Sequence, residues 1–164
     1  MLDARAARLV AGDLLARKAW SSAELVRRLR RRGAPDDVAR DVVRDLEGRG
    51  YLDDGAFARW WAQARAKGRR VGSLRLRQEL AAKGIPRDLA KAAIDAAFEE
   101  GPEEDRALEA GRRRLSTLAR TAPERAATRL SGYLLRRGYP PQMVRRVVTR
   151  LVGRDPGAAE ADGV

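Results

Sequence analysis

The chain of 164 residues carries a formal net charge of +12, which predicts a polyanionic partner, either a nucleic acid or an acidic protein surface. It contains no cysteine and no histidine, which excludes disulfides, thiol nucleophiles, zinc sites built on thiolate or imidazole, and catalytic triads with a histidine base. Aromatic residues make up only 5% of the sequence, so the core must consist mainly of Ala, Leu and Val, a composition that favours helices.

The first 20 residues contain no continuous apolar stretch of signal-peptide length. Asp3 and Asp13 also count against an organelle transit peptide, because such peptides are poor in acidic residues. No apolar run in the sequence approaches the roughly 18 residues that a membrane-spanning helix needs. We therefore expect a soluble, cytoplasmic protein with no membrane partner.

Three stretches of the sequence align on a glycine that is followed, two positions later, by a proline. The glycines are Gly33, Gly84 and Gly138, and leucines lie four and eight positions before each of them. Apolar positions on both sides of the glycine recur at helical spacing. Glycine adopts the left-handed conformation that closes a helix, and proline is tolerated in the first turn of the next helix. Each stretch therefore predicts two amphipathic helices joined at a Gly-x-Pro corner.

A further helix-like segment precedes each pair, over residues 4–18, 54–67 and 103–118. The sequence thus predicts an all-α fold of three tandem three-helix repeats. Such small units bury little surface alone, so neighbouring repeats should stack into an elongated array. The predicted limits are 1–53 for the first repeat, 54–101 for the second, 102–153 for the third and 154–164 for a disordered tail.

Two of the predicted helices begin with the signature of a capping box. In this motif a hydroxyl residue and a glutamate three positions later each accept a hydrogen bond from the other's backbone N–H. The signature pairs Ser21 with Glu24 and Thr121 with Glu124. We expect a helix to begin directly after each hydroxyl residue.

The adjacent carboxylates of Asp53 and Asp54 allow two interpretations, a catalytic or metal-binding pair or the start of a helix. With Asp53 as N-cap, Leu52 and Phe57 occupy the positions of a hydrophobic staple. Asp54 then lies in the first turn, where the helix dipole favours negative charge. Capping explains both acids without chemistry, and we favour it.

A pair of tryptophans follows these acids. Phe57, Trp61 and Ala64 share one helical face, so Trp61 should be a core residue. Trp60 lies at the edge of this face and is a candidate for a partner contact or for stacking on a nucleic-acid base.

Sequence signatures of catalysis are absent. No glycine directly precedes a lysine, so the chain has no phosphate-binding GxxxxGK[ST] loop. The acidic cluster at residues 99–105 flanks a Gly-Pro pair, which indicates a solvated linker and a helix start rather than a converging metal site. We expect no catalytic residue, no cofactor and no metal.

Basic residues gather in each predicted repeat. A single surface arginine usually serves solubility, but the whole set, at this net charge, predicts binding to nucleic acid or to an acidic groove. The residues selected as candidate contacts are Arg28, Arg31, Arg32, Lys67, Arg69, Arg70, Arg75, Arg77, Lys83, Arg113, Arg136 and Arg137.

Two segments resemble the RecX family of bacterial recombination regulators. The family's G-Y-L-D-D-x-x-F signature is matched by Gly50, Tyr51, Leu52, Asp53, Asp54 and Phe57. Its G-x-x-x-I-R-x-E-L-x-x-K-G-I pattern is matched, with Leu76 in place of the usual isoleucine, by Gly72, Arg77, Glu79, Leu80, Lys83, Gly84 and Ile85. The segment "KGRRVG" departs from the family pattern by replacing an aromatic-containing stretch with added charge. The resemblance covers about residues 5–152.

This resemblance implies a non-catalytic protein whose three repeats form a curved array. The implied partner is the RecA recombinase on single-stranded DNA, with the regulator bound in the filament groove. It would suppress the ATPase, coprotease and strand-exchange activities of RecA, and so act in DNA repair, recombination and the SOS response. We expect a monomer with nonspecific affinity for single-stranded or duplex DNA.

Two other functions stay open. Three-helix units with a basic helix also resemble homeodomain-like modules that bind DNA directly. A catalytic protein that uses the acidic pairs would instead show divalent-dependent turnover.

Overall fold

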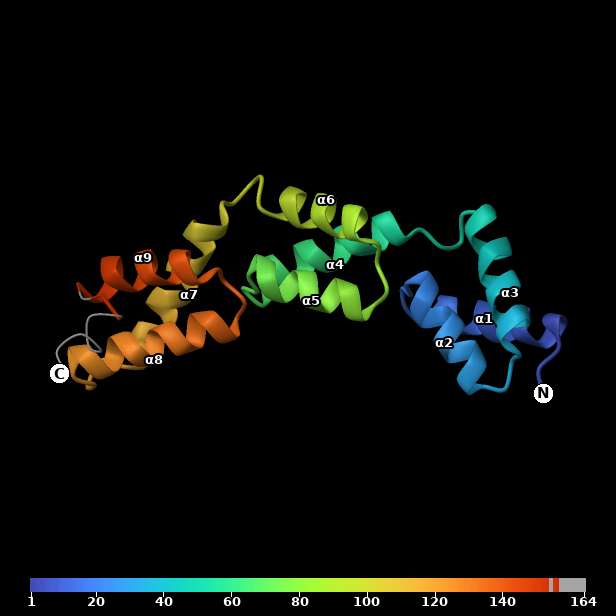
Figure 1. Ribbon diagram of the computed structural model, residues 1–164, viewed down its shortest axis with the longest axis horizontal. Helices are drawn as coiled ribbons and strands as arrows, with labels where there is room; N and C mark the ends of the chain where they lie inside the picture. The colour runs from blue at the N-terminus through green and yellow to red at the C-terminus, as the bar shows by residue number, and fades with distance from the viewer. Residues whose placement is uncertain (154, 157–164) are drawn as a thin grey trace. The chain divides into compact units, whose positions relative to one another are not determined.

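The computed structural model describes residues 1–153, 155 and 156, and this part of the chain consists of nine helices with no strand (Figure 1). The helices form three tandem three-helix repeats, as predicted. Their bounds are α1 Ala4–Arg17, α2 Ser22–Arg31, α3 Asp36–Gly48, α4 Asp54–Gly68, α5 Ser73–Ala82, α6 Arg87–Ala97, α7 Glu103–Ser116, α8 Pro123–Arg136 and α9 Pro141–Val152. None of these described helices is long and apolar enough to cross a membrane. The predicted tail at 154–164 lies outside the described residues, except for 155 and 156.

The segments expected to open each repeat are helical. α1, α4 and α7 begin at the predicted residues and end within two residues of the predicted ends. α1 is capped by Asp3, whose side chain accepts a hydrogen bond from the Ala6 N–H at 2.8 Å. Just before this cap, the Leu2 N–H donates to the carbonyl of Gly33 at 2.9 Å. This hydrogen bond therefore links the residues that precede α1 to the turn between α2 and α3.

The three Gly-x-Pro corners adopt the predicted conformation. Gly33, Gly84 and Gly138 have φ angles of 94°, 73° and 86°, in the left-handed region that glycine tolerates. The residue after each glycine donates to a carbonyl five residues earlier, which satisfies an orphan carbonyl at the end of the helix. Pro35 and Pro140 are the N-caps of α3 and α9, one position before the first turn where we had placed the prolines.

Of the two predicted capping boxes, the first is confirmed and the second is wrong. Ser21 accepts from the Glu24 N–H at 3.2 Å, and Glu24 accepts from the Ser21 N–H at 3.5 Å. α8 begins instead at Pro123, so Ala122, not Thr121, is its N-cap. A proline disfavours the helical conformation in the residue before it, which keeps Ala122 extended and prevents the helix from starting earlier.

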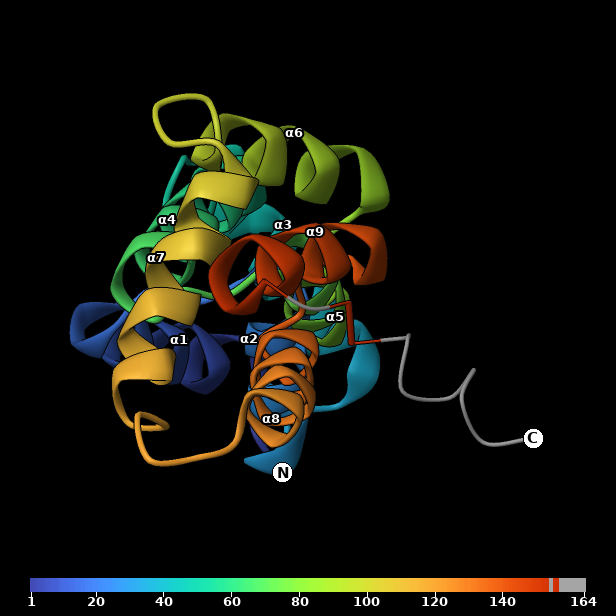
Figure 2. The same cartoon turned by 90° about the vertical axis from the view of Figure 1, so that its left-hand side faces the viewer.

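The chain divides into two compact units, whose limits do not coincide with those of the repeats. The first joins Met1–Trp61 to Glu79–Ala93, and the second joins Ala62–Gln78 to the chain from Ile94 onward. In the first unit, α1, α2 and α3 pack around Ala, Leu and Val side chains. In the second, α7, α8 and α9 lie together (Figure 2). Their core is similar and includes Tyr139. The repeat limits and the curvature of the array stay predictions.

The buried face of α4 differs from the predicted one. Ala58, Ala62 and Ala66 are fully buried at a spacing of four residues, whereas Ala64 is exposed. Trp61 lies at the flank of this row and is half-buried, so its prediction as a core residue is wrong in degree. The sequence pattern had placed the large Trp61 at the centre of the buried face. In the structure the small alanines lie there, because they allow helices to approach closely.

Candidate functional site

Asp53 and Asp54 both accept hydrogen bonds from helix N-termini. The Asp53 side chain accepts from the Ala56 N–H at 2.9 Å, which confirms it as the N-cap of α4. The Asp54 side chain accepts from the Ser22 N–H at 2.9 Å and so caps the first turn of α2 as well. Among the described residues no three His, Cys, Asp or Glu side chains converge to hold a metal ion. Asp53 thus caps its own helix, and Asp54 ties α4 to α2.

In the first unit, the N-terminus of α2 lies on the turn that ends α5; we call this contact the first junction. The Ser21 hydroxyl donates to the carbonyl of Lys83 at 2.6 Å. The Lys83 ammonium pairs with the Glu24 carboxylate at 2.8 Å. A Cβ on Gly84 would overlap the methyl group of Ala23, so glycine is needed for the close approach as well as for its positive φ.

Lys83, a predicted contact residue, is held inside this junction. Only 19% of its side chain is exposed, and its Nζ lies 4.1 Å from the centroid of the Trp61 ring. The indole N–H of Trp61 donates to Glu79 at 3.0 Å. Burial opposes ionisation of Glu24, but the hydrogen bond and charge of Lys83 outweigh it and lower the pKa of this carboxyl below its ordinary value.

In the second unit, the N-terminus of α5 lies on the turn that ends α8; this is the second junction. The Gly72 N–H donates to the carbonyl of Arg137 at 2.8 Å, and the Leu74 N–H donates to the carbonyl of Gly138 at 3.0 Å. A Cβ on Gly72 would lie 2.5 Å from the Gly138 backbone. The second junction is therefore formed directly by hydrogen bonds between backbone groups.

Tyr139 anchors the same junction from the core. Its hydroxyl donates to the carbonyl of Arg70 at 2.8 Å, and burial, with the nearby charge of Glu103, raises the pKa of this hydroxyl. Arg70 is half-buried with a φ of 50°, and its guanidinium donates to Glu109 at 3.3 Å. The predicted contact residue Arg70 thus has a structural role.

Two further predicted contact residues also donate to carbonyls at this junction. Arg75 Nη1 donates to the carbonyl of Arg136 at 3.1 Å. Arg137 Nη1 donates to the carbonyl of Arg69 at 2.5 Å, and its guanidinium lies 5.1 Å from the centroid of the Tyr133 ring. Guanidinium groups here replace the acid–base pair of the first junction.

Two members of the acidic cluster have partners that the sequence did not reveal. Glu103 accepts from the Ser73 N–H at 2.6 Å and so caps the start of α5. Glu104 pairs with Arg146 of α9 at 2.9 Å. Both acids lie in the first turn of α7, which confirms the predicted helix start. Their description as merely solvated residues is wrong, because both also tie α7 to other helices.

The remaining predicted contact residues lie at the surface. Arg28 is half-buried on α2, and Arg113 is exposed but pairs with Glu109 at 3.1 Å. The others are exposed and make no side-chain hydrogen bond or ion pair within the described part of the chain; they are Arg31, Arg32, Lys67, Arg69, Arg77 and Arg136.

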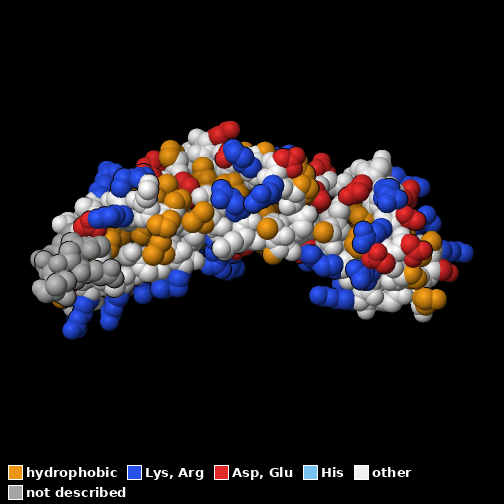
Figure 3. Space-filling view, in the orientation of Figure 1, with side chains coloured by type: hydrophobic (Ala, Val, Ile, Leu, Met, Phe, Trp, Pro, Cys, Tyr) orange, Lys and Arg blue, Asp and Glu red, His pale blue; other side chains and the backbone are white. Residues whose placement is uncertain are grey.

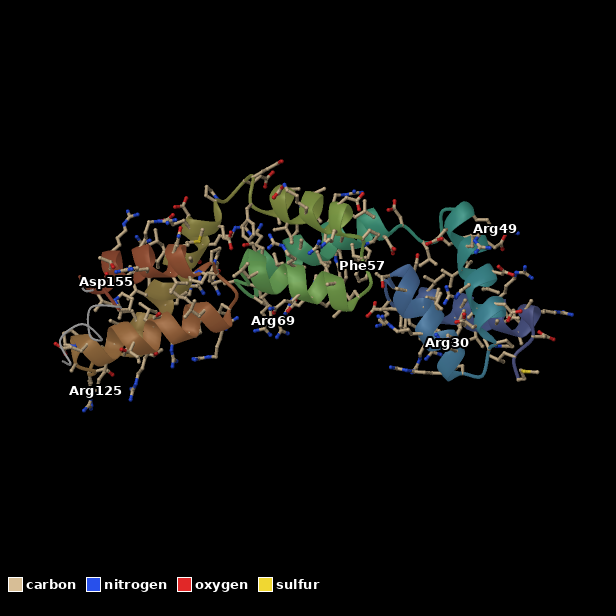
Figure 4. All side chains as sticks on the ribbon, in the orientation of Figure 1. Arg30, Arg49, Phe57, Arg69, Arg125 and Asp155 are labelled. Carbon is tan, nitrogen blue, oxygen red and sulfur yellow. The ribbon has the colours of Figure 1, made fainter. Side chains whose placement is uncertain are left out.

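α8 carries two exposed arginines that the sequence analysis did not select. Arg125 and Arg129 are one helical turn apart, with no side-chain partner among the described residues. Figure 4 places Arg125 and Arg69 along one edge of the second unit, and Figure 3 shows basic side chains gathered along α8. The sequence does contain a signal that could have identified these two arginines. Arg125 and Arg129 are four residues apart, which is one helical turn, and Arg136 follows seven residues later.

The fold and the two junctions define a class, that of helical-repeat proteins whose surface is rich in arginine. Family models for the second and third three-helix domains of RecX match residues 53–94 and 102–148. The chain is 35% identical to regulatory protein RecX of Thermobifida fusca, over 87% of this chain and 76% of the relative. It is 38% identical to regulatory protein RecX of Mycobacterium avium, over 87% and 82%.

A crystal structure of RecX from Lactobacillus salivarius superposes with a TM-score of 0.78 at 14% identity, covering 90% of this chain and 96% of that one. A second crystal structure, of regulatory protein RecX, gives a TM-score of 0.75 at 18% identity, covering 88% and 72%. These structures share the fold, and the sequence relatives give the family. The chain belongs to the RecX family of regulatory proteins.

Proposed function

We propose that this protein binds in the groove of the RecA filament on single-stranded DNA and inhibits the ATPase, coprotease and strand-exchange activities of the recombinase. It does so without catalysis of its own and thereby modulates DNA repair and recombination. The observation that carries this proposal is the identity of 35–38% to proteins named regulatory protein RecX over most of both chains.

The exposed arginines support a polyanionic partner. They include, in the first unit, Arg31 at the end of α2 and its C-cap Arg32, and, in the second, Arg125 and Arg129 on α8. Unpaired guanidinium groups at a surface are available for carboxylates and phosphates, which they bind in a bidentate manner. Both units therefore offer positive surface to an acidic protein groove that also contains nucleic acid.

The hydrogen bonds that the acidic residues accept support a regulator rather than a hydrolase. Asp53, Asp54 and Glu103 each accept a backbone N–H at the start of a helix. Such bonds occupy the carboxylate oxygen that a metal ion or a substrate proton would need. The charges of these acids serve the packing of helices.

One observation favours direct DNA binding as a second candidate. Arg27, Arg30 and Arg31 line a shallow cavity of about 370 Å³ on α2. A basic helix of this kind gives nonspecific affinity for phosphates with a steep dependence on salt. If this were the main function, the affinity for naked duplex would account for every effect on the recombinase.

The test is the DNA-dependent ATPase rate of RecA from the same organism, with this protein titrated from substoichiometric to equimolar amounts at two salt concentrations. We expect inhibition well below one regulator per RecA protomer. Arg125→Gln with Arg129→Gln should weaken it, whereas Arg44→Gln with Arg17→Gln, which removes two exposed arginines paired with Asp41 and Asp13, should not. Inhibition only when the DNA itself is saturated would instead support the DNA-binding module.

A further inference from the structure

A cavity of about 440 Å³ in the first unit concentrates aromatic side chains. Trp20, Tyr51, Phe57 and Trp60 all line it, which is half of the eight Trp, Tyr and Phe residues in the chain. They come from the segment after α1, the connection from α3 to α4, and α4 itself. Segments distant in the sequence thus bring aromatic rings to one place on a protein that is otherwise poor in them.

Two of these rings face water. Tyr51 is 67% exposed and Trp60 is 54% exposed, although burial of a large aromatic side chain is normally favourable. Neither ring is needed to fill the core, which contains Ala, Leu and Val in this unit. Exposed aromatics beside a cavity are typical of a binding surface.

The walls of the cavity are held in place. The indole N–H of Trp20 donates to the carbonyl of Leu14 at 3.0 Å. The Tyr51 N–H donates to the carbonyl of Leu46 at 2.9 Å, which fixes the backbone below its ring. Trp60 packs edge to face on Phe57, with ring centroids 5.9 Å apart. Such rings lose little conformational entropy when a ligand binds.

One cation at the cavity can pair with an anionic group of a ligand. Lys18 lies at its edge, with Nζ 3.8 Å from the centroid of the Trp20 ring. Asp53 also lines the cavity, but its carboxylate accepts the Ala56 N–H at the positive end of α4, which offsets its charge. The net charge of +12 adds a long-range attraction for polyanions.

We propose that this cavity binds an unstacked base of a single-stranded nucleic acid, with Tyr51 and Trp60 as stacking surfaces and Lys18 as a contact to the adjacent phosphate. Planar ring faces beside a cation match a nucleotide, since every base has a π-face and is joined to a phosphate. An apolar protein side chain would use the rings but not the cation. The inference deepens the proposed function, because a RecA filament contains a single strand, yet it is tested without RecA.

The experiment measures the affinity of the full chain for fluorescein-labelled oligothymidylate by anisotropy. Trp60→Ala and Tyr51→Ala should each weaken binding between about 5-fold and about 160-fold, the range found for loss of a stacked ring. Trp60→Phe should restore most of the affinity. Leu9→Ala, which truncates a side chain that is 71% exposed elsewhere in the same unit, should leave the affinity unchanged.

The salt dependence separates the rings from the cation. For Lys18→Gln the slope of log affinity against log salt should become shallower by about 0.7, the value for one phosphate of a single strand. For Trp60→Ala the slope should stay the same while the affinity falls. An oligomer of abasic sites, which keeps the phosphates without the bases, should bind the parent and Trp60→Ala equally.

Three results would overturn the proposal. One is equal affinity of the parent, Trp60→Ala and Tyr51→Ala for oligothymidylate. Another is an equal loss of affinity for duplex and for single strand. The third is a loss of RecA inhibition in Trp60→Ala while oligothymidylate binding is unchanged, which would make the cavity a protein-docking site. Intact base binding without any RecA inhibition would support this inference and contradict the proposed function.

Discussion

Each of the two junctions joins the N-terminus of one helix to the turn that ends another, but the two use different atoms. Ser21 and Gly72 occupy equivalent positions, each 12 residues before the corner glycine of its own repeat. Each donates to the carbonyl of the basic residue before the next corner glycine, Ser21 through its hydroxyl to Lys83 and Gly72 through its backbone N–H to Arg137. The comparison teaches that the acceptor, a carbonyl at the end of a helix, stays the same while the donor varies.

The side chains around the two acceptors differ accordingly. Glu24 pairs with Lys83 at the first junction, whereas Arg75, at the position equivalent to Glu24, donates to the carbonyl of Arg136 at the second. An acid–base pair depends on pH, whereas guanidinium donors bound to carbonyls stay charged. Because the pKa of Glu24 is lowered, the first junction should weaken in acid.

The largest effect should come from the corner glycines. Gly138→Ala adds a Cβ that meets the Arg75 backbone and places alanine at positive φ, so we expect the free energy of unfolding to fall by about 3 kcal/mol. Gly33→Ala is the matched control, because Gly33 has the same φ region but no atom within 4 Å of its added Cβ. It should cost only about 1 kcal/mol. Equal losses in urea denaturation would show that the close approach is unimportant.

The next effect concerns the donor at the first junction. Ser21→Ala removes the cap of the Glu24 N–H and the bond to the Lys83 carbonyl, and should lower the unfolding free energy by about 2 kcal/mol. Ser116→Ala, which removes one exposed hydroxyl bond to the Arg113 carbonyl, is the control and should change it by less than about 0.5 kcal/mol. A loss for Ser21→Ala no larger than that of the control would contradict the junction.

A smaller effect should depend on pH. Since the folded-state pKa of Glu24 lies below its ordinary value of 4.5, its ion pair stabilises the protein at neutral pH. This contribution, about 1 kcal/mol, is lost as the pH falls through the folded pKa. Glu24→Gln should therefore lower the melting temperature at pH 7, and the difference from the parent should shrink below pH 4.5. Glu47→Gln, at an exposed position of α3, should show no such trend.

The smallest effect on stability should come from the exposed arginines of α8. Arg129→Gln removes no side-chain partner among the described residues, so the unfolding free energy should stay within about 0.5 kcal/mol of the parent. The same change should weaken inhibition of the RecA ATPase. Arg137→Gln should do the opposite and act mainly on stability, because its guanidinium binds the Arg69 carbonyl.

Local signals in the sequence predicted local structure well. The corners are specified by the conformational freedom of their own glycines, Gly33, Gly84 and Gly138. The cap of α4 is specified by Asp53, which accepts the N–H only three residues later in the sequence. The prediction of Thr121 as an N-cap was wrong because Pro123 has the stronger effect on where the helix begins. These features depend on a few adjacent residues, which is why sequence pattern reaches them.

Long-range partners were out of reach. The second bond of Ser21 joins residues 62 positions apart, and the Asp54 bond to Ser22 spans 32. For the same reason Lys83 and Arg137 were chosen as partner contacts. A basic residue in solvent looks the same in sequence as one bound to a carboxylate, like Lys83, or to a backbone carbonyl, like Arg137. The aromatic cavity likewise depends on α1 and α4 meeting, which spacing alone does not give.

The bond from the Leu2 N–H to the Gly33 carbonyl has a counterpart at the second junction. There the equivalent carbonyl, that of Gly138, accepts the Leu74 N–H of the neighbouring helix. At Gly33 the donor comes instead from the backbone just before α1. This backbone thus acts as an internal substitute for a neighbouring repeat at the corner between α2 and α3.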